Sequence, residues 1–231
     1  MSLLAYIMSV IGIAPNVDAV VIGTLMLLVP GLLFTNAMRD IIYGDTNSGV
    51  NRIVQVLLIA VALALGTGAA WNVIASIWGA PVSAESIVHS LGAQCLYSFL
   101  GSLGLEFLFN IHGPGALLCT LGGVLAWILY DVVYRISGSD LIAYFWAALG
   151  SSFYAEIMAR IRKCPAIAYL VVAIFPLIPG AGVYYTMEQA MQGNMDLFAS
   201  KGMHTAAIAG IMAVAILLVS TVTRMITAHK K

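Results

Sequence analysis

The chain has 231 residues, of which 61% are hydrophobic and only 9% charged, and its mean hydropathy is +1.00. Soluble domains carry about 25% charged residues, so the composition excludes a soluble globular domain, a disordered chain and a coiled coil. Ten Lys and Arg balance ten Asp and Glu, which excludes a nucleic-acid binder, because that function needs a basic excess. The composition therefore indicates an all-α, polytopic protein of the lipid bilayer.

Hydropathy predicts about seven spans, each long enough to cross about 30 Å of hydrocarbon. They cover residues 17–38, 53–71, 86–109, 116–134, 141–158, 165–187 and 205–223. Residues 1–14 are expected to form the exit half of a further helix. The longest non-apolar stretches, expected to be loops, are residues 39–52, 72–85 and 188–204.

Lys and Arg are distributed unevenly over the loops that alternate between these spans. One side receives two of them, Arg135 and Lys201, and the other receives eight: Arg39, Arg52, Arg160, Arg162, Lys163, Arg224, Lys230 and Lys231. Because cytoplasmic loops carry the excess of basic residues, we predict a cytoplasmic C-terminus and an outer location for residue 15. A start on the outer face leads us to expect a missing N-terminal segment or a partner subunit; the alternative is a short interfacial helix.

Two stretches, residues 28–45 and 177–194, resemble each other at a constant offset of 149 residues, with 5 identities in 18. They belong to the first and sixth predicted spans, which cross in opposite directions. Opposed repeats of this kind are a common architecture of secondary transporters. We therefore predict part of a 5+5 inverted repeat, with residues 1–80 ending one transporter domain and residues 81–231 forming the second.

A Pro-Gly pair lies near the middle of each repeated span, at Pro30-Gly31 and Pro179-Gly180. Proline removes a helical hydrogen bond and glycine adds backbone freedom, so each pair can split its span into half-helices. The exposed N-terminus of a half-helix suits a carboxylate. The alternative is a simple kink at each proline.

Polar and aromatic residues follow both pairs and are candidate ligands for the ammonium and carboxylate groups of a small-molecule substrate. Helix–helix hydrogen bonding is the alternative for each of them. These residues are Thr35, Asn36, Tyr184, Tyr185 and Thr186.

Glu106, Asp131 and Glu156 lie within or near predicted spans, where charge is costly and marks a pathway by default. Asp131 and Glu156 each have an arginine four residues later, which predicts interfacial salt bridges. Glu106 has no such neighbour and follows a face of small residues, so it is a candidate for proton coupling. A buried neutral carboxyl group is the alternative.

The segment LMLLVPGLLFTNAMRDIIYGDTNSGVNR, residues 25–52, resembles the signature of the threonine/serine exporter family, and FPLIPGAGVYYTM resembles its second domain. The resemblance implies proton-coupled export of small amino acids or dicarboxylates across a bacterial plasma membrane, by domains that are fused or separate subunits. Within the signature, Arg39, Asp40 and Asp45 are candidate coupling or gating residues, together with Glu106 and Glu156. The family's first domain also has a soluble N-terminal region and about three more spans, which this sequence lacks.

Two other classes of function are weighed against a carrier. An intramembrane enzyme is disfavoured, because no histidine lies in the middle of a span and no phosphate-binding glycine loop is present. A channel-like or assembly subunit shows no charged filter and is the main alternative. Cys95, Cys119 and Cys164 have no paired spacing, so we expect no metal site, and no cofactor is predicted.

Overall fold

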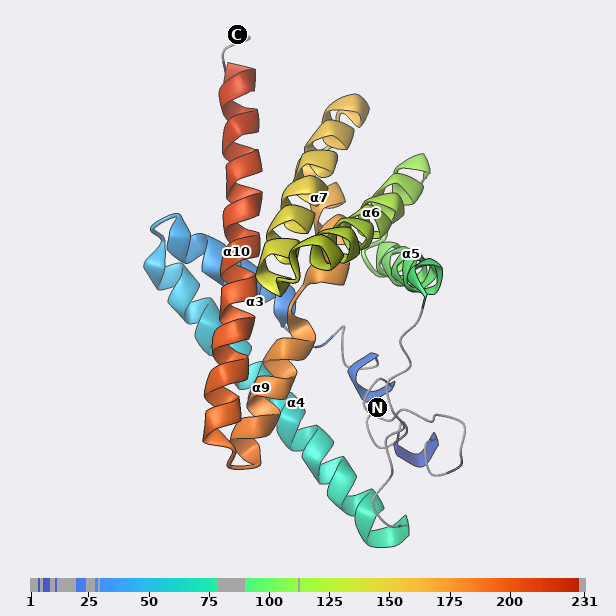
Figure 1. The fold of residues 1–231 in the computed structure, drawn as a ribbon, viewed down its shortest axis with the longest axis vertical. Coiled ribbons are helices and arrows are strands. Elements are labelled where there is room, and N and C mark those ends of the chain that lie inside the picture. The colour runs from blue at the N-terminus through green and yellow to red at the C-terminus, as the bar shows by residue number, and fades with distance from the viewer. Residues whose placement is uncertain are drawn as a thin grey trace. The chain divides into compact units, whose positions relative to one another are not determined.

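The computed structural model of the protein describes residues 4, 6–8, 11, 20–23, 28, 30–78, 90–111 and 113–228. The regular structure in these residues is helical throughout (Figure 1), which confirms the all-α prediction. The chain forms two compact units, each built from segments that are distant in sequence. Unit 1 comprises Met1–Ala37, Asp45–Val88 and Pro179–Ala206, and unit 2 comprises Met38–Gly44, His89–Ile178 and Ala207–Lys231.

Unit 1 is organised around the long helix α4 (Thr46–Trp78). The shorter helix α9 (Gly180–Met191) packs along it. Small apolar residues on α4 allow this close approach, because Ala60 and Ala64 lie in the same buried cluster as Val183 and Met187 of α9. Helices α3 (Gly31–Ile42) and α10 (Met195–Ala228) begin in the same unit.

Unit 2 is centred on helix α6 (Pro114–Ser137), which contacts α5 (Leu91–Leu108), α7 (Asp140–Arg162) and α8 (Ala166–Ile174). Gly138 ends α6 with φ of 64°, a conformation that glycine adopts without strain. It is followed by only one residue before α7 begins, so α6 and α7 form a tight hairpin. The 3-10 helix η1 (Phe175–Leu177) follows α8 directly.

The described residues contain five helices that are long and apolar enough to span a membrane. The count rises to six if the bent pair formed by α8 and α9 is one span. The prediction of seven spans is therefore not confirmed. The predicted first span, residues 17–38, lies largely outside the described residues, and of the N-terminal half-helix only residues 4, 6–8 and 11 are described.

The long helices extend well beyond the predicted spans. Helix α4 begins at Thr46 and α10 at Met195, so much of each predicted loop at residues 39–52 and 188–204 is helical. The predicted loop at residues 72–85 is likewise helical as far as Trp78. Hydropathy locates the apolar part of a helix, whereas backbone hydrogen bonding continues through polar turns at its ends.

The two segments that resemble each other at an offset of 149 residues also have the same local structure. Helices α3 and α9 each contain 12 residues and start and end at equivalent positions, and α4 and α10 start at equivalent positions, Thr46 and Met195. The equivalent glycines Gly44 and Gly193 both have positive φ, 92° and 78°. Each repeat is therefore a helix of three turns, a left-handed glycine and a long helix.

Candidate substrate site

Both Pro-Gly pairs stand at the start of a helix, and both pairs are buried. In α3 the N–H of Phe34 donates to the carbonyl oxygen of Pro30 at 2.9 Å, and in α9 the N–H of Val183 donates to that of Pro179 at 3.3 Å. The N–H groups of residues 31–33 and 180–182 precede these first helical bonds. Such groups carry the positive end of the helix dipole and suit an anionic ligand.

The chain before α9 is interrupted as the sequence predicts. Helix α8 ends at Ile174, η1 contains Pro176, and Pro179 is the residue that precedes α9. The predicted span at residues 165–187 is thus α8 and η1, followed by α9 after the two non-helical residues Ile178 and Pro179. On the other repeat, Leu28 lies in a turn and α3 begins at Gly31.

The two helix starts share a packing partner inside unit 1. Leu33 and Phe34 of α3 pack against the same buried cluster that contains Val183 and Met187 of α9. The remaining members of this cluster come from α4 and are Val56, Ala60 and Ala64. One face of α4 therefore holds both of the helices that begin with Pro-Gly.

The two candidate threonines make local hydrogen bonds. The Oγ1–H of Thr35 donates to the carbonyl oxygen of Gly31 at 3.2 Å, and that of Thr186 donates to the carbonyl oxygen of Gly182 at 2.7 Å. A hydroxyl bonded in this way keeps its lone pairs as acceptors. Asn36 is half-buried one position after Thr35.

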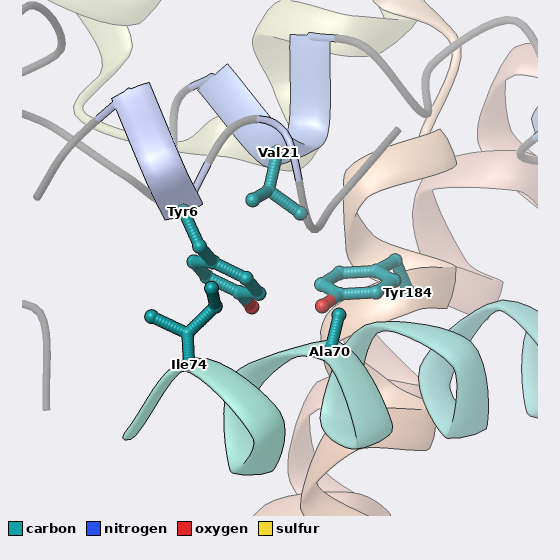
Figure 2. Close-up of a cluster of buried hydrophobic side chains, with 5 residues drawn as sticks. All are labelled: Tyr6, Val21, Ala70, Ile74 and Tyr184. Carbon is teal, nitrogen blue, oxygen red and sulfur yellow. The ribbon is translucent and has the colours of Figure 1, made fainter. Parts of the chain in front are cut away.

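Tyr184 lies in the hydrophobic core of unit 1, where it is only 6% exposed. Figure 2 shows its ring together with Ala70 and Ile74 of α4, and Tyr6 and Val21 complete the cluster. Its hydroxyl donates to the Oγ1 of Thr67 at 3.0 Å. The structure therefore gives Tyr184 a packing role beside α4, which a substrate-binding role would have to accommodate.

Tyr185, next along α9, is half-buried and its ring already faces a cation. The Nζ of Lys201 lies 5.3 Å from the ring centroid, within the range of a cation–π contact. Sequence reasoning did not select Lys201 as a site residue. A signal was available, because Lys201 and Arg52 are equivalent in the repeat and each is the seventh residue of its long helix.

The charged residues of the signature motif, at the end of α3 and just after it, have structural partners. The Oδ1 of Asp45 accepts from the backbone N–H of Ser48 at 3.3 Å and so caps the start of α4. Arg39 and Asp40 are adjacent in sequence, and Arg39 Nε lies 4.0 Å from Asp40 Oδ1. Neither arrangement tests the predicted coupling or gating roles.

Glu106 lies in unit 2, on α5, and is only 2% exposed. Its Oε1 accepts a hydrogen bond from Thr120 Oγ1 of α6 at 2.6 Å. One turn earlier on α5, Ser102 is fully buried, and among the described residues its Oγ is the one buried side-chain oxygen or nitrogen without a hydrogen-bond partner. A carboxyl group and two hydroxyls therefore share the interface between α5 and α6.

Two of the three small residues predicted beside Glu106, Ser98 and Ser102, lie against α6, whereas Gly101 is exposed with nothing within 4 Å of an added Cβ. Ser98 Oγ donates to the carbonyl oxygen of Gly123 at 3.1 Å. A Cβ added at Gly123 would lie 2.1 Å from Ser102 Oγ, so a larger residue here would displace the Ser102 hydroxyl. Close helix contact through small residues is typical of membrane interiors.

The two predicted salt bridges have different outcomes. Arg135 and Asp131 form a bidentate pair at 2.6 Å and 3.1 Å, which confirms the first. Arg160 donates from Nη2 to the carbonyl oxygen of Thr223 on α10 at 3.1 Å, and Glu156 lines a groove beside it. The ion pair between Glu156 and Arg160 stays a prediction.

Apolar helices of membrane-spanning length, with buried polar groups between them, define the protein as a multi-pass membrane protein. A family model described as "Threonine/Serine exporter, ThrE" matches residues 94–222, and a second threonine/serine exporter model matches residues 1–74. The chain therefore belongs to the threonine/serine exporter family, a family of membrane exporters. No curated protein and no solved structure matches the chain.

Proposed function

We propose that the protein exports small metabolites that carry a carboxylate, either threonine- and serine-like amino acids or dicarboxylates. The substrate binds at the starts of α3 and α9 in unit 1. The observation that carries this proposal is the pair of buried Pro-Gly helix starts on one face of α4. Two helix N-termini in one unit supply backbone donors for carboxylate groups without a buried unpaired cation.

The two substrate classes would use this site differently. A dicarboxylate would engage both helix N-termini. An amino acid would engage one of them and place its ammonium group near the amide oxygen of Asn36 or the ring of Tyr185. The contact between Lys201 and Tyr185 supports the second arrangement, because it shows that this ring face accommodates an ammonium group.

We further propose that export is coupled to protons through Glu106. A carboxyl group buried between two spans is a functional candidate by default. Thr120 supplies a hydroxyl partner and Ser102 a second, unpartnered hydroxyl one turn away. The carboxyl group of Glu106 can hold a proton, and it can release that proton when its hydrogen-bond partners change during the transport cycle.

Substrate binding to the purified protein and counterflow in proteoliposomes test the site with threonine, serine and succinate as probes. We expect Asn36→Ala to weaken amino-acid binding about tenfold or more, because a hydrogen bond to a charged group is lost. Asn72→Ala makes the same chemical change at an exposed position of α4 and should bind normally. Equal binding by both variants would remove Asn36 from the site.

Counterflow also separates a carrier from a channel. A carrier exchanges labelled substrate against unlabelled substrate on the other side, whereas a channel shows no such trans-stimulation. The need for a preceding segment or partner subunit remains a prediction. Robust counterflow by this chain alone would show that neither is needed.

A further inference from the structure

Helix α5 carries a polar residue at every fourth position. These residues are Ser90, which caps the helix, Gln94, Ser98, Ser102 and Glu106. Residues four apart are neighbours on one face of a helix. From Ser90 to Glu106 the row covers about 24 Å of helix axis, most of the roughly 30 Å of a bilayer's hydrocarbon core. Ser90 is exposed and Glu106 is buried, so the row leads from the surface of the protein into its interior.

Side chains of this row bond directly to α6. Gln94 Oε1 accepts from Trp127 Nε1 at 2.9 Å, and Ser98 Oγ donates to the carbonyl oxygen of Gly123 at 3.1 Å. At the far end, Glu106 Oε1 accepts from a threonine of α6. The row therefore follows the interface between α5 and α6, and all of it belongs to unit 2.

Ser102, one turn before Glu106, differs from other buried serines. It is 0% exposed, and its Oγ has no hydrogen-bond partner among the described residues. On α7 the buried Ser151 and Ser152 instead donate to the backbone carbonyl four residues earlier. A Cβ on Gly123 would overlap Ser102 Oγ, so this hydroxyl points toward α6. A buried polar group that is left without a protein partner requires an explanation, such as bound water or a functional role.

We propose that Ser102 relays protons between Glu106 and the Ser90 end of α5. A proton that arrives on a water molecule beside Ser98 passes to the Ser102 oxygen, while the Ser102 hydroxyl gives its own proton to the Glu106 carboxylate. Water and hydroxyl are neutral again after this step, and the reverse exchange releases the proton. A serine hydroxyl can act in this way because it donates and accepts hydrogen bonds at once. The relay rests on the proposed proton coupling through Glu106.

Other titratable groups are linked electrostatically to Glu106 or to Cys119, its neighbour on α6. They are Cys119 itself, Tyr154, Arg162, Cys164 and Tyr169. The Cys119 thiol donates to the carbonyl oxygen of Ala168 at 4.0 Å, and the Tyr154 hydroxyl donates to that of Leu118 at 2.7 Å. Backbone carbonyls accept hydrogen bonds but have no proton to pass on. These contacts therefore favour the Ser102 side as the route to Glu106.

The relay leads in the direction that proton-driven export requires. The distribution of Lys and Arg predicts that α5 begins on the outer side of the membrane. Protons that enter there reach Glu106 along the row, and they leave on the cytoplasmic side in exchange for exported substrate.

Infrared spectroscopy of the full chain in lipid bilayers at acidic pH tests the relay. The C=O stretching band of Glu106 is identified by its loss in Glu106→Gln, and a rapid change to D2O starts the exchange of its proton for deuterium. We expect Ser102→Ala to slow this exchange about a hundredfold, the lower end of the effect of a positioned proton-transfer group. Removal of a buried hydroxyl without a partner costs little or no stability, so misfolding would not explain the slower exchange.

Two variants in the same unit serve as controls. Ser151→Ala removes an equally buried hydroxyl that has its own acceptor, and Cys119→Ala changes the other neighbour of Glu106. Both should exchange at the unaltered rate. Unaltered exchange in Ser102→Ala, or equal slowing by Ser102→Ala and either control, would overturn the relay and leave Glu106 as the coupling group. The absence of any band that Glu106→Gln removes would show that Glu106 holds no proton, and it would overturn the proposed coupling as well.

Discussion

Glu106 is the residue on which proton coupling can be tested most directly. Glu106→Gln keeps the size of the side chain and an oxygen for the Thr120 hydroxyl, but it cannot take up or release a proton. We expect a pH gradient to stop driving substrate accumulation, while counterflow at equal pH continues. Uptake into inside-out vesicles, with and without the gradient, measures both quantities.

Two comparisons make the Glu106 result specific. Glu156→Gln alters another candidate carboxylate of unit 2, which lines the groove between α7 and α10, and should leave the gradient dependence in place. Thr120→Val removes the hydrogen-bond donor but keeps the carboxyl group, so it should change the pH range of coupling and not abolish it. Gradient-driven accumulation by Glu106→Gln at the unaltered level would make Glu106 a buried structural residue.

The sequence did not predict the surroundings of two residues, Tyr184 and Lys201, because these depend on how the helices pack. Tyr184 follows Pro179 at a spacing that suggests a ligand, yet its ring lies among Ala70 and Ile74 and its hydroxyl bonds Thr67 of α4. Those partners are more than a hundred residues away in sequence. Lys201 was missed for a related reason, since a lone lysine in a polar stretch carries no local signal apart from its match to Arg52.

At the scale of elements, the Pro and Gly residues predicted where helices begin, but the sequence did not predict how long the helices are. The Pro-Gly pairs predicted the starts of α3 and α9, and the structure begins both helices at the glycine. The same sequence signals could not show that α4 and α10 begin well before their apolar segments. The first turn of α4 is polar and is capped by Asp45. In the first turn of α10, Phe198 packs against the buried cluster that contains Val183 and Met187.

The contact between α9 and α10 provides an element-scale prediction. A Cβ added at Gly182 would lie 2.5 Å from Thr205 Oγ1 and 3.0 Å from its Cγ2, both in unit 1. Overpacking of this kind costs about 1–3 kcal/mol. We therefore expect Gly182→Ala to lower the thermal unfolding temperature of the purified protein, and Thr205→Ala in the same chain to recover most of the loss.

Gly66→Ala serves as the matched control for that contact. Gly66 lies inside α4 in the same unit, and a Cβ added there meets nothing within 4 Å. Alanine is the better helix former by about 1 kcal/mol, so this variant should be neutral or stabilising. Unfolding temperatures that are equal for Gly182→Ala and Gly66→Ala would show that α9 and α10 are not in close contact.

At the scale of the whole molecule, the repeat and the basic residues make one joint prediction. Residues 47 and 196 are equivalent at the offset of 149, and both are exposed in the first turn of a long helix, α4 or α10. An inverted repeat places equivalent positions on opposite sides of the membrane. The eight-to-two distribution of Lys and Arg predicts that residue 47 is the cytoplasmic one.

Single cysteines at these two positions show on which side of the membrane each position lies. They are introduced in intact cells into a chain whose Cys95, Cys119 and Cys164 are replaced. We expect an impermeant thiol reagent to label Asp196→Cys from outside, and Asn47→Cys only after the membrane is opened. Labelling of both positions from one side would mean that the two repeats cross the membrane in the same direction. The equivalent bounds of α3 and α9 would then belong to a parallel repeat. Labelling of Asn47→Cys alone from outside would keep the inverted repeat but reverse its orientation. In that case the distribution of Lys and Arg would not determine the orientation of the chain in the membrane. The direction of transport would then have to be measured again with substrate added on the opposite side of the membrane.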